Sequence, residues 1–287
     1  MYKIAVDIGG TNIKIAVIDD NLEIVDYQKI STPDNINVLI VDETHTLIET
    51  LIHKYHLDNP HIGISSAGVV NSELGKIIYT GPTIPNFDGT NFFESFSDLS
   101  TDITLYNDVD AALLGELTFH EYEEDNIFCL TLGTGIGGAF YSKVGGIYRG
   151  ARYRANEIGY LLYRKLDETT FEQRASTSAL KDLMLRRNFE YNTDVPKLFE
   201  LAEAGNQEAL DILHVWGDFV AEGLAQIQII YDPGLILIGG GISSQGSTLL
   251  KYIEPKMHNY LPSDYGIARL QTTKLENNAA LFGAIQK

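Results

Sequence analysis

Two short segments of the chain combine glycine with threonine in the manner of anion-binding turns. The first is Gly9-Gly10-Thr11-Asn12, and the second is Gly133-Thr134-Gly135. Glycine lets the backbone direct successive N–H groups toward one point, where they and small hydroxyls can bind phosphate oxygens. Two such turns could hold a polyphosphate from both sides. Two tight turns without a ligand are the alternative.

Two aspartates stand next to predicted strand ends, where carboxylates can take part in chemistry. Asp7 directly precedes the first glycine segment. A carboxylate facing a triphosphate requires a cation such as Mg²⁺ between them, and a plain strand-end carboxylate is the alternative. Asp108 lies where a strand ends and a helix begins. It could accept a proton during phosphoryl transfer or act as the helix N-cap, and both interpretations stay open at this point.

The second glycine segment also matches a dinucleotide-binding pattern, but its surroundings argue against that function. Gly133, Gly135 and Gly138 satisfy G-x-G-x-x-G. That pattern is meaningful only where a helix follows, because the helix N-terminus binds the pyrophosphate. Residues 139–146 have no helical periodicity and contain another glycine pair. We therefore predict a β-hairpin at this place.

A strand, a turn and a second strand position each glycine segment. β-forming runs at 4–8 and 13–18 flank the first turn, and runs at 127–132 and 139–141 flank the second. We interpret this recurrence as one structural unit used once in each of two domains. Further strands are predicted at 62–65, 103–107 and 235–238, and helices at 38–55, 109–123, 171–187, 206–231 and 279–285.

Length, charge and cysteine content limit the class of protein. The 287 residues are enough for about two domains. A net charge of −18 disfavours nucleic acid and anionic membranes as partners. The single cysteine, Cys129, excludes an internal disulfide and any multi-cysteine metal site, and its apolar neighbours predict burial. Without an apparent signal peptide or membrane span, we expect a cytoplasmic protein.

Several motifs, in order, resemble the ROK family of bacterial sugar kinases and sugar-responsive repressors, which belongs to the actin-like ATPase superfamily. The resemblance covers essentially the whole chain. The segments that carry it are Asp7–Lys14, Ile84-Pro85-Asn86-Phe87, Asn107-Asp108, Leu132–Gly138, Glu157-Ile158-Gly159 and Leu237-Ile238-Gly239-Gly240-Gly241-Ile242-Ser243.

The resemblance implies an α/β, two-lobed actin-like ATPase (ribonuclease H-like) fold with a cleft between the lobes. The small N-terminal lobe would comprise residues 1–115, to which a helix at 275–287 would return, and the large lobe 116–274. The implied reaction is ATP- and Mg²⁺-dependent phosphorylation of a sugar at its 6-hydroxyl. Asp108 would be the catalytic base, and Asp7 would hold Mg²⁺, directly or through water.

The family pattern also implies two sets of binding residues. Glu157 and Glu172 can accept paired hydrogen bonds from vicinal diols, although Glu172 could equally be a solvated residue in a helix's first turn. The implied sugar-binding residues are Gly68, Asn86, Asn107, Asp108, Glu157, Tyr160 and Glu172. The implied nucleotide-binding residues are Asp7, Gly9, Gly10, Thr11, Asn12, Lys14, Gly133, Thr134, Gly135, Gly240 and Gly241. Lys14 lies within a predicted strand, so a solvated lysine is the alternative there.

Three departures from the family pattern bear on the substrate and on metal binding. Tyr160 stands where histidine is usual, Ala67 where proline is common, and the Cys-x-Cys-Gly-x-x-Gly-Cys loop is missing. The phenol of Tyr160 could replace the histidine contact to a sugar hydroxyl, or it could only fill the space of the missing loop. Thiolate ligands have no replacement here, so we predict no structural zinc. Short members without this loop resemble N-acetylmannosamine kinases. Glucose and β-glucosides are alternative substrates.

Two non-enzymatic alternatives follow from the same resemblance. A repressor would carry a DNA-binding segment ahead of the first glycine motif, whereas only six residues precede Asp7. A non-catalytic sugar sensor would not need Asp108. We therefore expect an enzyme that acts on a small sugar. We also expect a homodimer.

Overall fold

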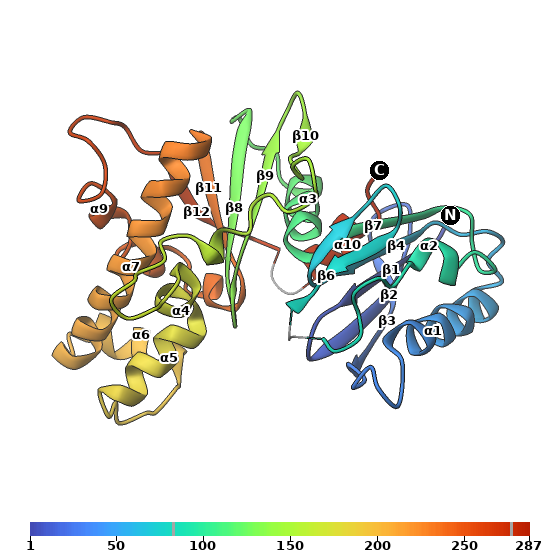
Figure 1. The fold of residues 1–287 in the computed structure, drawn as a ribbon, viewed down its shortest axis with the longest axis horizontal. Helices are drawn as coiled ribbons and strands as arrows, with labels where there is room; N and C mark the ends of the chain where they lie inside the picture. The colour runs from blue at the N-terminus through green and yellow to red at the C-terminus, as the bar shows by residue number, and fades with distance from the viewer. Residues whose placement is uncertain (82–83, 276–277) are drawn as a thin grey trace. The chain divides into compact units, whose positions relative to one another are not determined.

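The computed structural model describes residues 1–81, 84–275 and 278–287, and the chain divides into two compact units (Figure 1). Unit 1 comprises residues 1–121, 149–155 and 278–287, and unit 2 comprises residues 122–148 and 156–277. The lobe boundary that the resemblance implies, between residues 115 and 116, stays a prediction.

Unit 1 is built on a five-stranded sheet in the order β3-β2-β1-β4-β7. The pairs β1–β2 and β2–β3 are antiparallel, and the pairs β1–β4 and β4–β7 are parallel. The strands are β1 (Lys3–Ile8), β2 (Asn12–Ile18), β3 (Ile24–Ser31), β4 (Ile62–Ser66) and β7 (Ile103–Asn107), with a separate hairpin of β5 (Val69–Asn71) and β6 (Lys76–Tyr79). The helices are α1 (Ile40–Tyr55), α2 (Phe92–Ser95), α3 (Asp108–Phe119) and α10 (Ala279–Ala284).

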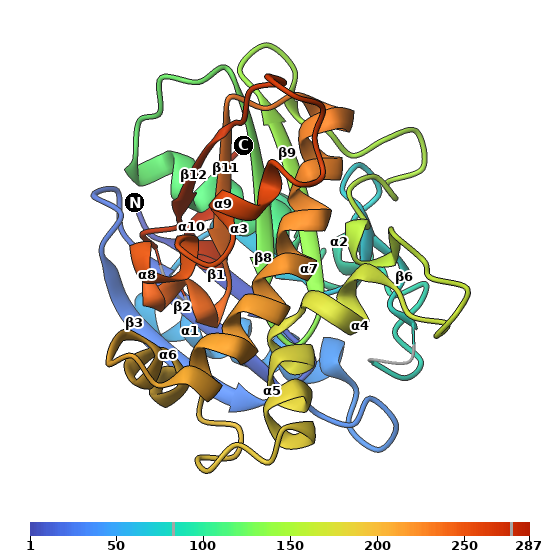
Figure 2. The same cartoon turned by 90° about the vertical axis from the view of Figure 1, so that its left-hand side faces the viewer.

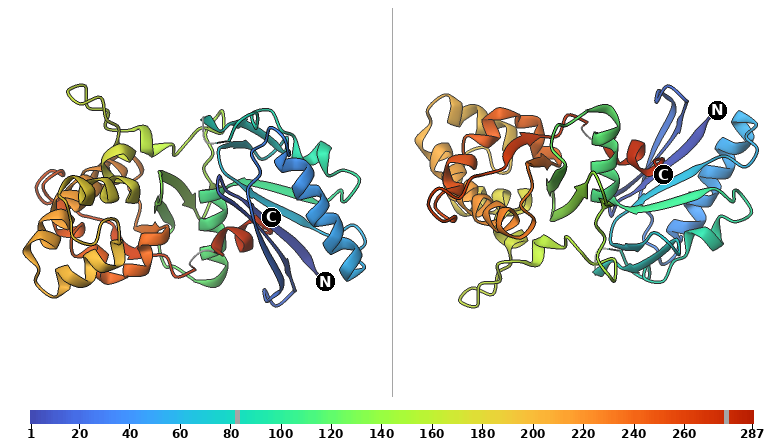
Figure 3. Two further views of the ribbon diagram at one scale, coloured as in Figure 1. Left: turned by 90° about the horizontal axis from the view of Figure 1, so that it is seen from below. Right: turned by 90° about the horizontal axis from the view of Figure 1, so that it is seen from above.

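Helices cover both faces of this sheet (Figures 1 and 3). Ile4, Val6 and Ile8 alternate along β1 and belong to one buried cluster with Ile48 and Leu51 of α1. The alternation puts these three side chains on the α1 face, because successive residues of a strand point to opposite faces. Helices α3 and α10 lie on the other face.

Two glycines let α3 and α10 pack with their backbones in close contact. A Cβ atom at Gly115 would lie 2.0 Å from the carbonyl oxygen of Ala279, and one at Gly283 would lie 1.7 Å from that of Ala111. Any larger residue would therefore push the two helices apart. This packing places the last helix of the chain against the helix that Asp108 begins.

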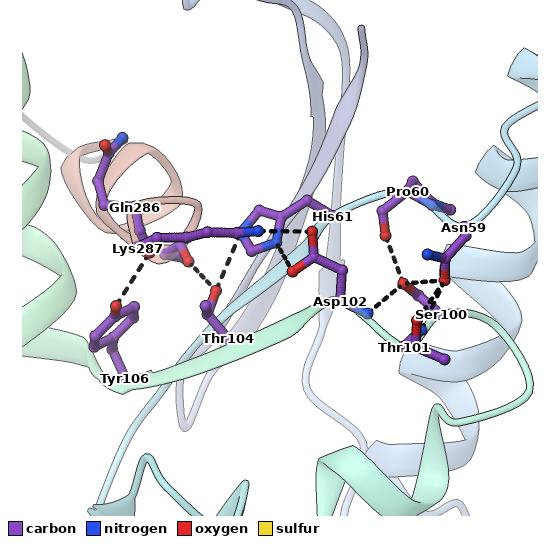
Figure 4. A network of polar contacts seen from close by, with 11 residues as sticks. Asn59, Pro60, His61, Ser100, Thr101, Asp102, Thr104, Tyr106, Gln286 and Lys287 are labelled. Atoms are coloured by element: carbon purple, nitrogen blue, oxygen red, sulfur yellow. Dashed lines mark hydrogen bonds and ion pairs between the residues drawn. The ribbon is translucent and has the colours of Figure 1, made fainter.

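Polar contacts also fasten the C-terminal segment to the rest of unit 1 (Figure 4). Thr104 Oγ1 donates to the carbonyl of Ala284 over 2.7 Å, and Lys287 Nζ contacts Asp102 over 2.9 Å. Asp102 also lies 3.1 Å from Nδ1 of the buried His61. Burial lowers the pKa of His61 despite this carboxylate.

Unit 2 is built on a second five-stranded sheet in the order β10-β9-β8-β11-β12. The strands are β8 (Asn126–Leu132), β9 (Ile136–Ser142), β10 (Gly146–Ile147), β11 (Leu235–Gly239) and β12 (Arg269–Thr272). The α-helices are α4 (Phe171–Ala175), α5 (Thr177–Arg186), α6 (Val195–Glu203), α7 (Gln207–Tyr231), α8 (Ser247–Leu250) and α9 (Glu254–Met257), and the 3₁₀ helices are η2 (Ile158–Tyr160) and η3 (Gly241–Gln245).

The two sheets have the same order of strand directions. In unit 2, the pairs β8–β9 and β9–β10 are antiparallel, and the pairs β8–β11 and β11–β12 are parallel, as in unit 1. In each sheet the central strand carries the glycine turn at its carboxyl end. The interpretation of the glycine segments as a repeated unit is confirmed. The hairpin predicted for the second segment is confirmed too, because a strand follows it rather than a helix.

Helix α7 lies across one face of the unit 2 sheet and organises its core (Figure 2). Trp216 is fully buried in the middle of α7, and its Nε1–H donates to the carbonyl of Ala175 over 2.9 Å. Cys129 in β8 is buried, as predicted. No helix in the described part of the chain is both long and apolar enough to cross a bilayer.

Three helix predictions need correction. The helix expected at 171–187 is two helices, because Ser176 adopts an extended conformation and its side chain caps α5 by accepting the N–H of Ala179. The helix expected at 109–123 ends at Phe119, since His120 is extended. Helix α1 begins at Ile40, two residues later than predicted, because Leu39 is still extended.

Candidate functional site

The first glycine turn connects β1 to β2 and is held in shape by a threonine outside it. The N–H of Gly9 donates to the carbonyl of Asn12 over 3.0 Å. Thr32 Oγ1 donates to the carbonyl of Gly9 over 2.6 Å, and the Thr32 N–H donates to the carbonyl of Thr11 over 2.9 Å. Gly10 and Thr11 are exposed at the tip. Sequence reasoning missed Thr32, because only the pairing of β3 with β2 brings it to the turn.

Asp7 lies beside this turn with a defined partner at each carboxylate oxygen. Ser65 Oγ donates to Oδ1 over 2.9 Å, and Lys14 Nζ donates to Oδ2 over 2.9 Å. The register of the sheet explains both contacts, because Asp7 pairs with Lys14 on one side and with Ser65 on the other. The predicted phosphate ligand Lys14 is therefore an ion-pair partner of Asp7. Ser65 is a second residue that the sequence analysis missed.

The surroundings of Asp7 fit a Mg²⁺ ion that is bound through its waters, and not one that the carboxylate coordinates directly. The Lys14 ammonium already neutralises much of the carboxylate charge, which weakens direct coordination of a dication. Mg²⁺ keeps several of its waters when bound, so Asp7 could hold an ion that arrives with ATP by accepting hydrogen bonds from those waters. Among the described residues, no three His, Cys, Asp or Glu side chains form a metal-binding group.

Asn107 forms the N-cap of α3, and Asp108 is the first residue of that helix. Asn107 Oδ1 accepts the N–H groups of Val109 and Asp110 over 2.9 and 3.3 Å. Asp108 Oδ1 accepts the N–H of Val109 over 3.0 Å. The interpretation of Asp108 as the helix N-cap is therefore wrong. The N-cap is Asn107, one residue earlier.

Two other predicted sugar-binding residues lie on loops of unit 1. Gly68 has φ +97°, and its carbonyl accepts a 2.9 Å hydrogen bond from Asn107 Nδ2. Asn86 has φ +53° and is exposed. The loop that carries it is held by Asn35, whose buried side chain donates from Nδ2 to the carbonyl of Pro85 over 2.6 Å. Asn107 and Gly68 thus form one group with Asp108, and Asn86 stands on a separate loop.

The second glycine turn connects β8 to β9 and is also held by a threonine outside it. The N–H of Gly133 donates to the carbonyl of Gly135 over 2.9 Å. Thr177, the first residue of α5, donates from its N–H to the carbonyl of Gly133 over 3.0 Å. Its Oγ1 donates to the carbonyl of Leu132, also over 3.0 Å. The tip residue Thr134 is exposed.

The third glycine cluster lies next to this turn. Gly240 follows β11 with φ +87°, and a Cβ atom there would lie 2.5 Å from the carbonyl oxygen of Leu132. Only glycine combines this backbone conformation with this approach. Gly241 then begins η3. Strands β8 and β11 are parallel neighbours, so their carboxyl ends lie side by side. This brings together two of the predicted nucleotide-binding segments.

Glu172 links the second turn to the other predicted sugar carboxylate. Its Oε2 accepts the N–H of Ile136, the residue after the turn, over 2.8 Å. Desolvation raises the pKa of the Glu157 carboxyl, and the nearby Glu172 carboxylate raises it further. Tyr160 is 66% exposed at the end of η2. The alternative of Glu172 as a merely solvated helix residue is therefore wrong.

The predicted residues thus fall into two groups, one on each unit. Unit 1 carries the first turn with Asp7 and the Asn107–Asp108 corner. Unit 2 carries the second turn with Gly240, Glu157 and Glu172. The threonines that hold the turns and the Ser65 partner of Asp7 add to these groups.

Comparison with known proteins identifies the family. The ROK family profile matches residues 3–286. An uncharacterised protein of Clostridium perfringens is 31% identical over 97% of this chain and 95% of its own length. A β-glucoside kinase of Listeria innocua is 28% identical over 98% of this chain and 95% of its own.

A solved structure agrees with this assignment. It belongs to a Listeria monocytogenes protein described as a candidate N-acetylmannosamine kinase, 26% identical, with a TM-score of 0.84 over 99% of this chain and 97% of that one. The α/β fold, with its repeated sheet, is the predicted actin-like ATPase fold. With a family match across nearly its whole length and this fold, the chain belongs to the ROK family.

Proposed function

We propose that the chain transfers the γ-phosphoryl group of ATP to the 6-hydroxyl of a hexose or N-acetylhexosamine, with Asp108 as the proton acceptor. The chain is an ATP:sugar phosphotransferase of the ROK family, and the proposal concerns its substrate and its catalytic residues. The single observation that carries it is that Asn107, and not Asp108, is the N-cap of α3. Asp108 is therefore the first residue of the helix, and its carboxylate is not the capping group.

Each glycine turn would bind phosphate oxygens of ATP. Both turns have their shape fixed from outside, by Thr32 and Thr177, and both leave tip residues exposed. Preorganised N–H groups bind an anion without first paying the entropy of ordering a loop. Mg²⁺ that comes with ATP would neutralise charge on the β- and γ-phosphates. Asp7, oriented by Ser65 and Lys14, would hold the waters of that ion.

The carboxylates of unit 2 would bind the sugar. Glu157 and Glu172 can each accept hydrogen bonds from ring hydroxyls. Glu172 uses Oε2 for the Ile136 N–H, and Oε1 accepts no hydrogen bond within the described part of the chain. We propose Oε1 as the acceptor for a sugar hydroxyl. Asn86 and Tyr160, which are both exposed, would add polar contacts.

Among sugars we favour N-acetylmannosamine. The absence of a cysteine loop after Tyr160 supports this choice, and so does the likeness to the Listeria monocytogenes protein. The β-glucoside kinase of Listeria innocua supports a β-glucoside as the second candidate, since it matches over 98% of this chain. Glucose is the third. These sugars differ at C1 and C2, so the discriminating contacts must lie at that end of the ring.

The test is ADP release by the purified chain with Mg·ATP and each sugar in turn. We expect release with N-acetylmannosamine at a higher kcat/KM than with glucose, N-acetylglucosamine or a β-glucoside. A 6-deoxy sugar should give no release, because the accepting hydroxyl is missing. Sugar binding without sugar-stimulated ADP release would contradict the proposal and favour a non-catalytic sensor. Light scattering of the same sample would check the expected homodimer.

A further inference from the structure

Arg174 is a buried arginine of unit 2. Its hydrogen bonds connect the two ends of the loop that precedes α4. It lies in α4, two residues after Glu172, and is 8% exposed. Nη1 donates to the Thr169 carbonyl over 2.8 Å and to Thr169 Oγ1 over 2.7 Å. Nη2 donates to the Leu162 carbonyl over 2.7 Å. The guanidinium therefore ties together the two ends of residues 161–170, which we name the 161–170 loop.

Backbone contacts close the same loop beneath the arginine. The N–H of Arg164 donates to the carbonyl of Thr169 over 2.8 Å, and the N–H of Phe171 donates to the carbonyl of Leu161 over 2.9 Å. The loop has a long exposed tip, where Leu166 is fully exposed. Its base is fixed by hydrogen bonds to Arg174 and between backbone groups, together with Leu161 and Leu162, which pack against the apolar core of unit 2.

Phe219 and Glu222 of helix α7 lie close to the two arginines at this loop. The Cζ atom of Arg174 lies 6.0 Å from the ring centroid of Phe219, and that of Arg164 lies 5.2 Å from the same centroid. Arg164 pairs with Glu222 over 2.6 Å. An aromatic ring within cation–π distance and a nearby carboxylate offset part of the cost of burying a cation. Burial nevertheless lowers the pKa of Arg174.

The closed loop joins two proposed sugar-binding segments. Glu157 and Tyr160 immediately precede it, and Glu172 follows it in α4. The segments also touch directly. A Cβ atom at Gly159 would lie 3.2 Å from Glu172 Oε2, and one at Gly135 would lie 2.4 Å from the same atom. The Glu172 carboxylate thus occupies a narrow space between η2 and the second glycine turn, so a small displacement of α4 would move it against its neighbours.

We infer that Arg174 is a positioning residue, which fixes α4 against the 161–170 loop and thereby holds Glu172 on the Ile136 N–H. Glu172 makes the contact with the turn, and Arg174 acts only through α4. Its planar fork matches this task, because it reaches acceptors on both loop ends at once, which a single ammonium group cannot do with the same geometry. The kinetic consequence rests on the proposed function, whereas the structural consequence does not.

Amide hydrogen exchange tests the structural consequence directly. In Arg174→Met, we expect faster exchange at the Ile136 amide, about tenfold or more, because its acceptor Glu172 is no longer held. Exchange at Leu130, in the same hairpin, reports on global unfolding and should change less. Arg186→Met is the matched control, since Arg186 is exposed on α5 of the same unit. Unchanged exchange at Ile136 in a folded Arg174→Met would overturn the inference.

Steady-state kinetics test the consequence for the reaction. Arg174→Met should raise KM for the sugar and for ATP about tenfold, because Glu172 contacts both the turn and the sugar segment. A variant that only loses stability would lower the apparent kcat through its folded fraction and leave both KM values unchanged. Arg174→Lys should recover part of the loss. KM values like those of the wild type in folded Arg174→Met would contradict a positioning role.

A second variant and the case of an inactive wild type complete the test. Should Arg174→Met fail to fold, Thr169→Val removes one acceptor of the fork and leaves the arginine in place. It should then show a smaller increase in exchange at Ile136, and no increase would overturn the inference. Should the wild type release no ADP with any sugar, the proposed function fails. The exchange result at Ile136 would still decide the role of Arg174.

Discussion

The side-chain amide of Asn107 donates a hydrogen bond to the carbonyl oxygen of Gly68 over 2.9 Å. The other end of the same amide accepts the N–H groups that begin α3. One side chain therefore fastens the end of β7, the start of α3 and the loop after β4 to one another. Asp108 is the first residue of α3. The bonds of the Asn107 amide to Gly68 on one side and to the first turn of α3 on the other therefore hold the backbone next to Asp108.

Replacement of Asn107 should impair both stability and catalysis. Asn107→Ala removes the cap and the bond to Gly68, so we expect the free energy of unfolding to fall by about 1–2 kcal/mol. We also expect kcat to fall about tenfold or more, because a catalytic carboxylate displaced by a fraction of an ångström aligns poorly with its hydroxyl. Denaturant unfolding and the ADP-release assay give the two quantities.

Asn206→Ala provides the matched control for this prediction. Asn206 caps α7 in the same way, by accepting the N–H of Ala209 over 2.9 Å. It should cost a similar free energy of unfolding and leave kcat unchanged. If the two variants lose stability equally and both keep full kcat, then Asn107 has no role beyond capping.

Replacement of Asp108 should affect catalysis alone. Asp108→Asn keeps the size of the side chain and removes its ability to accept a proton, so kcat should fall by about 10²–10⁴. The melting temperature should stay close to that of the wild type, because Asn107 provides the cap. Asp211→Asn, at an exposed position on α7, is the control and should change neither quantity. Near-normal kcat in Asp108→Asn would refute the assignment of the base.

The raised pKa of Glu157 should appear in the pH dependence of sugar binding. Desolvation and the Glu172 carboxylate raise this pKa above 4.5, so Glu157 gains its proton at a higher pH than an ordinary glutamate. A protonated Glu157 accepts hydrogen bonds from hydroxyls poorly. KM for the sugar should therefore rise as the pH falls through the raised pKa of Glu157. Glu172→Gln removes one of the two causes and should shift this rise to lower pH. An unchanged KM profile would contradict the coupling of the two carboxyls.

The same pKa has a defined effect on stability. The native state binds the Glu157 proton more tightly than the unfolded chain does. This group therefore lowers the free energy of unfolding as pH rises from 4.5 through the raised pKa. Glu157→Gln should remove that part of the pH dependence, which urea unfolding at several pH values would measure. A steeper dependence in the variant would show that the sign is wrong.

The threonine that holds the first glycine turn should affect ATP binding. Thr32→Val removes the Oγ1 bond to Gly9 and keeps the Thr32 N–H bond to Thr11. We expect KM for ATP to rise about three- to tenfold, since one hydrogen bond is lost, while KM for the sugar changes little. Thr50→Val is the control, because Thr50 lies on the exposed face of α1, where its Oγ1 donates to the carbonyl of Thr46. Equal KM for ATP in both variants would exclude a role of Thr32 in shaping the turn.

The sequence by itself identified the family, the repeated strand–turn–strand pattern and most residues of the candidate site. These features are local. A glycine turn between two β-forming runs, or Asn-Asp between a strand and a helix, can be recognised within about ten residues because backbone preferences act over that range. The family resemblance added the roles that local patterns left open for Glu157 and Asp108.

Only the tertiary structure decided which side chains serve those residues. Thr32, Ser65 and Thr177 reach the turns or Asp7 through strand pairing and helix packing across many residues of sequence. Asn107, and not Asp108, caps α3, and its amide also donates to the carbonyl of Gly68, which lies 39 residues earlier in the chain. Such contacts depend on register and on the fit of packed elements, which no local pattern specifies.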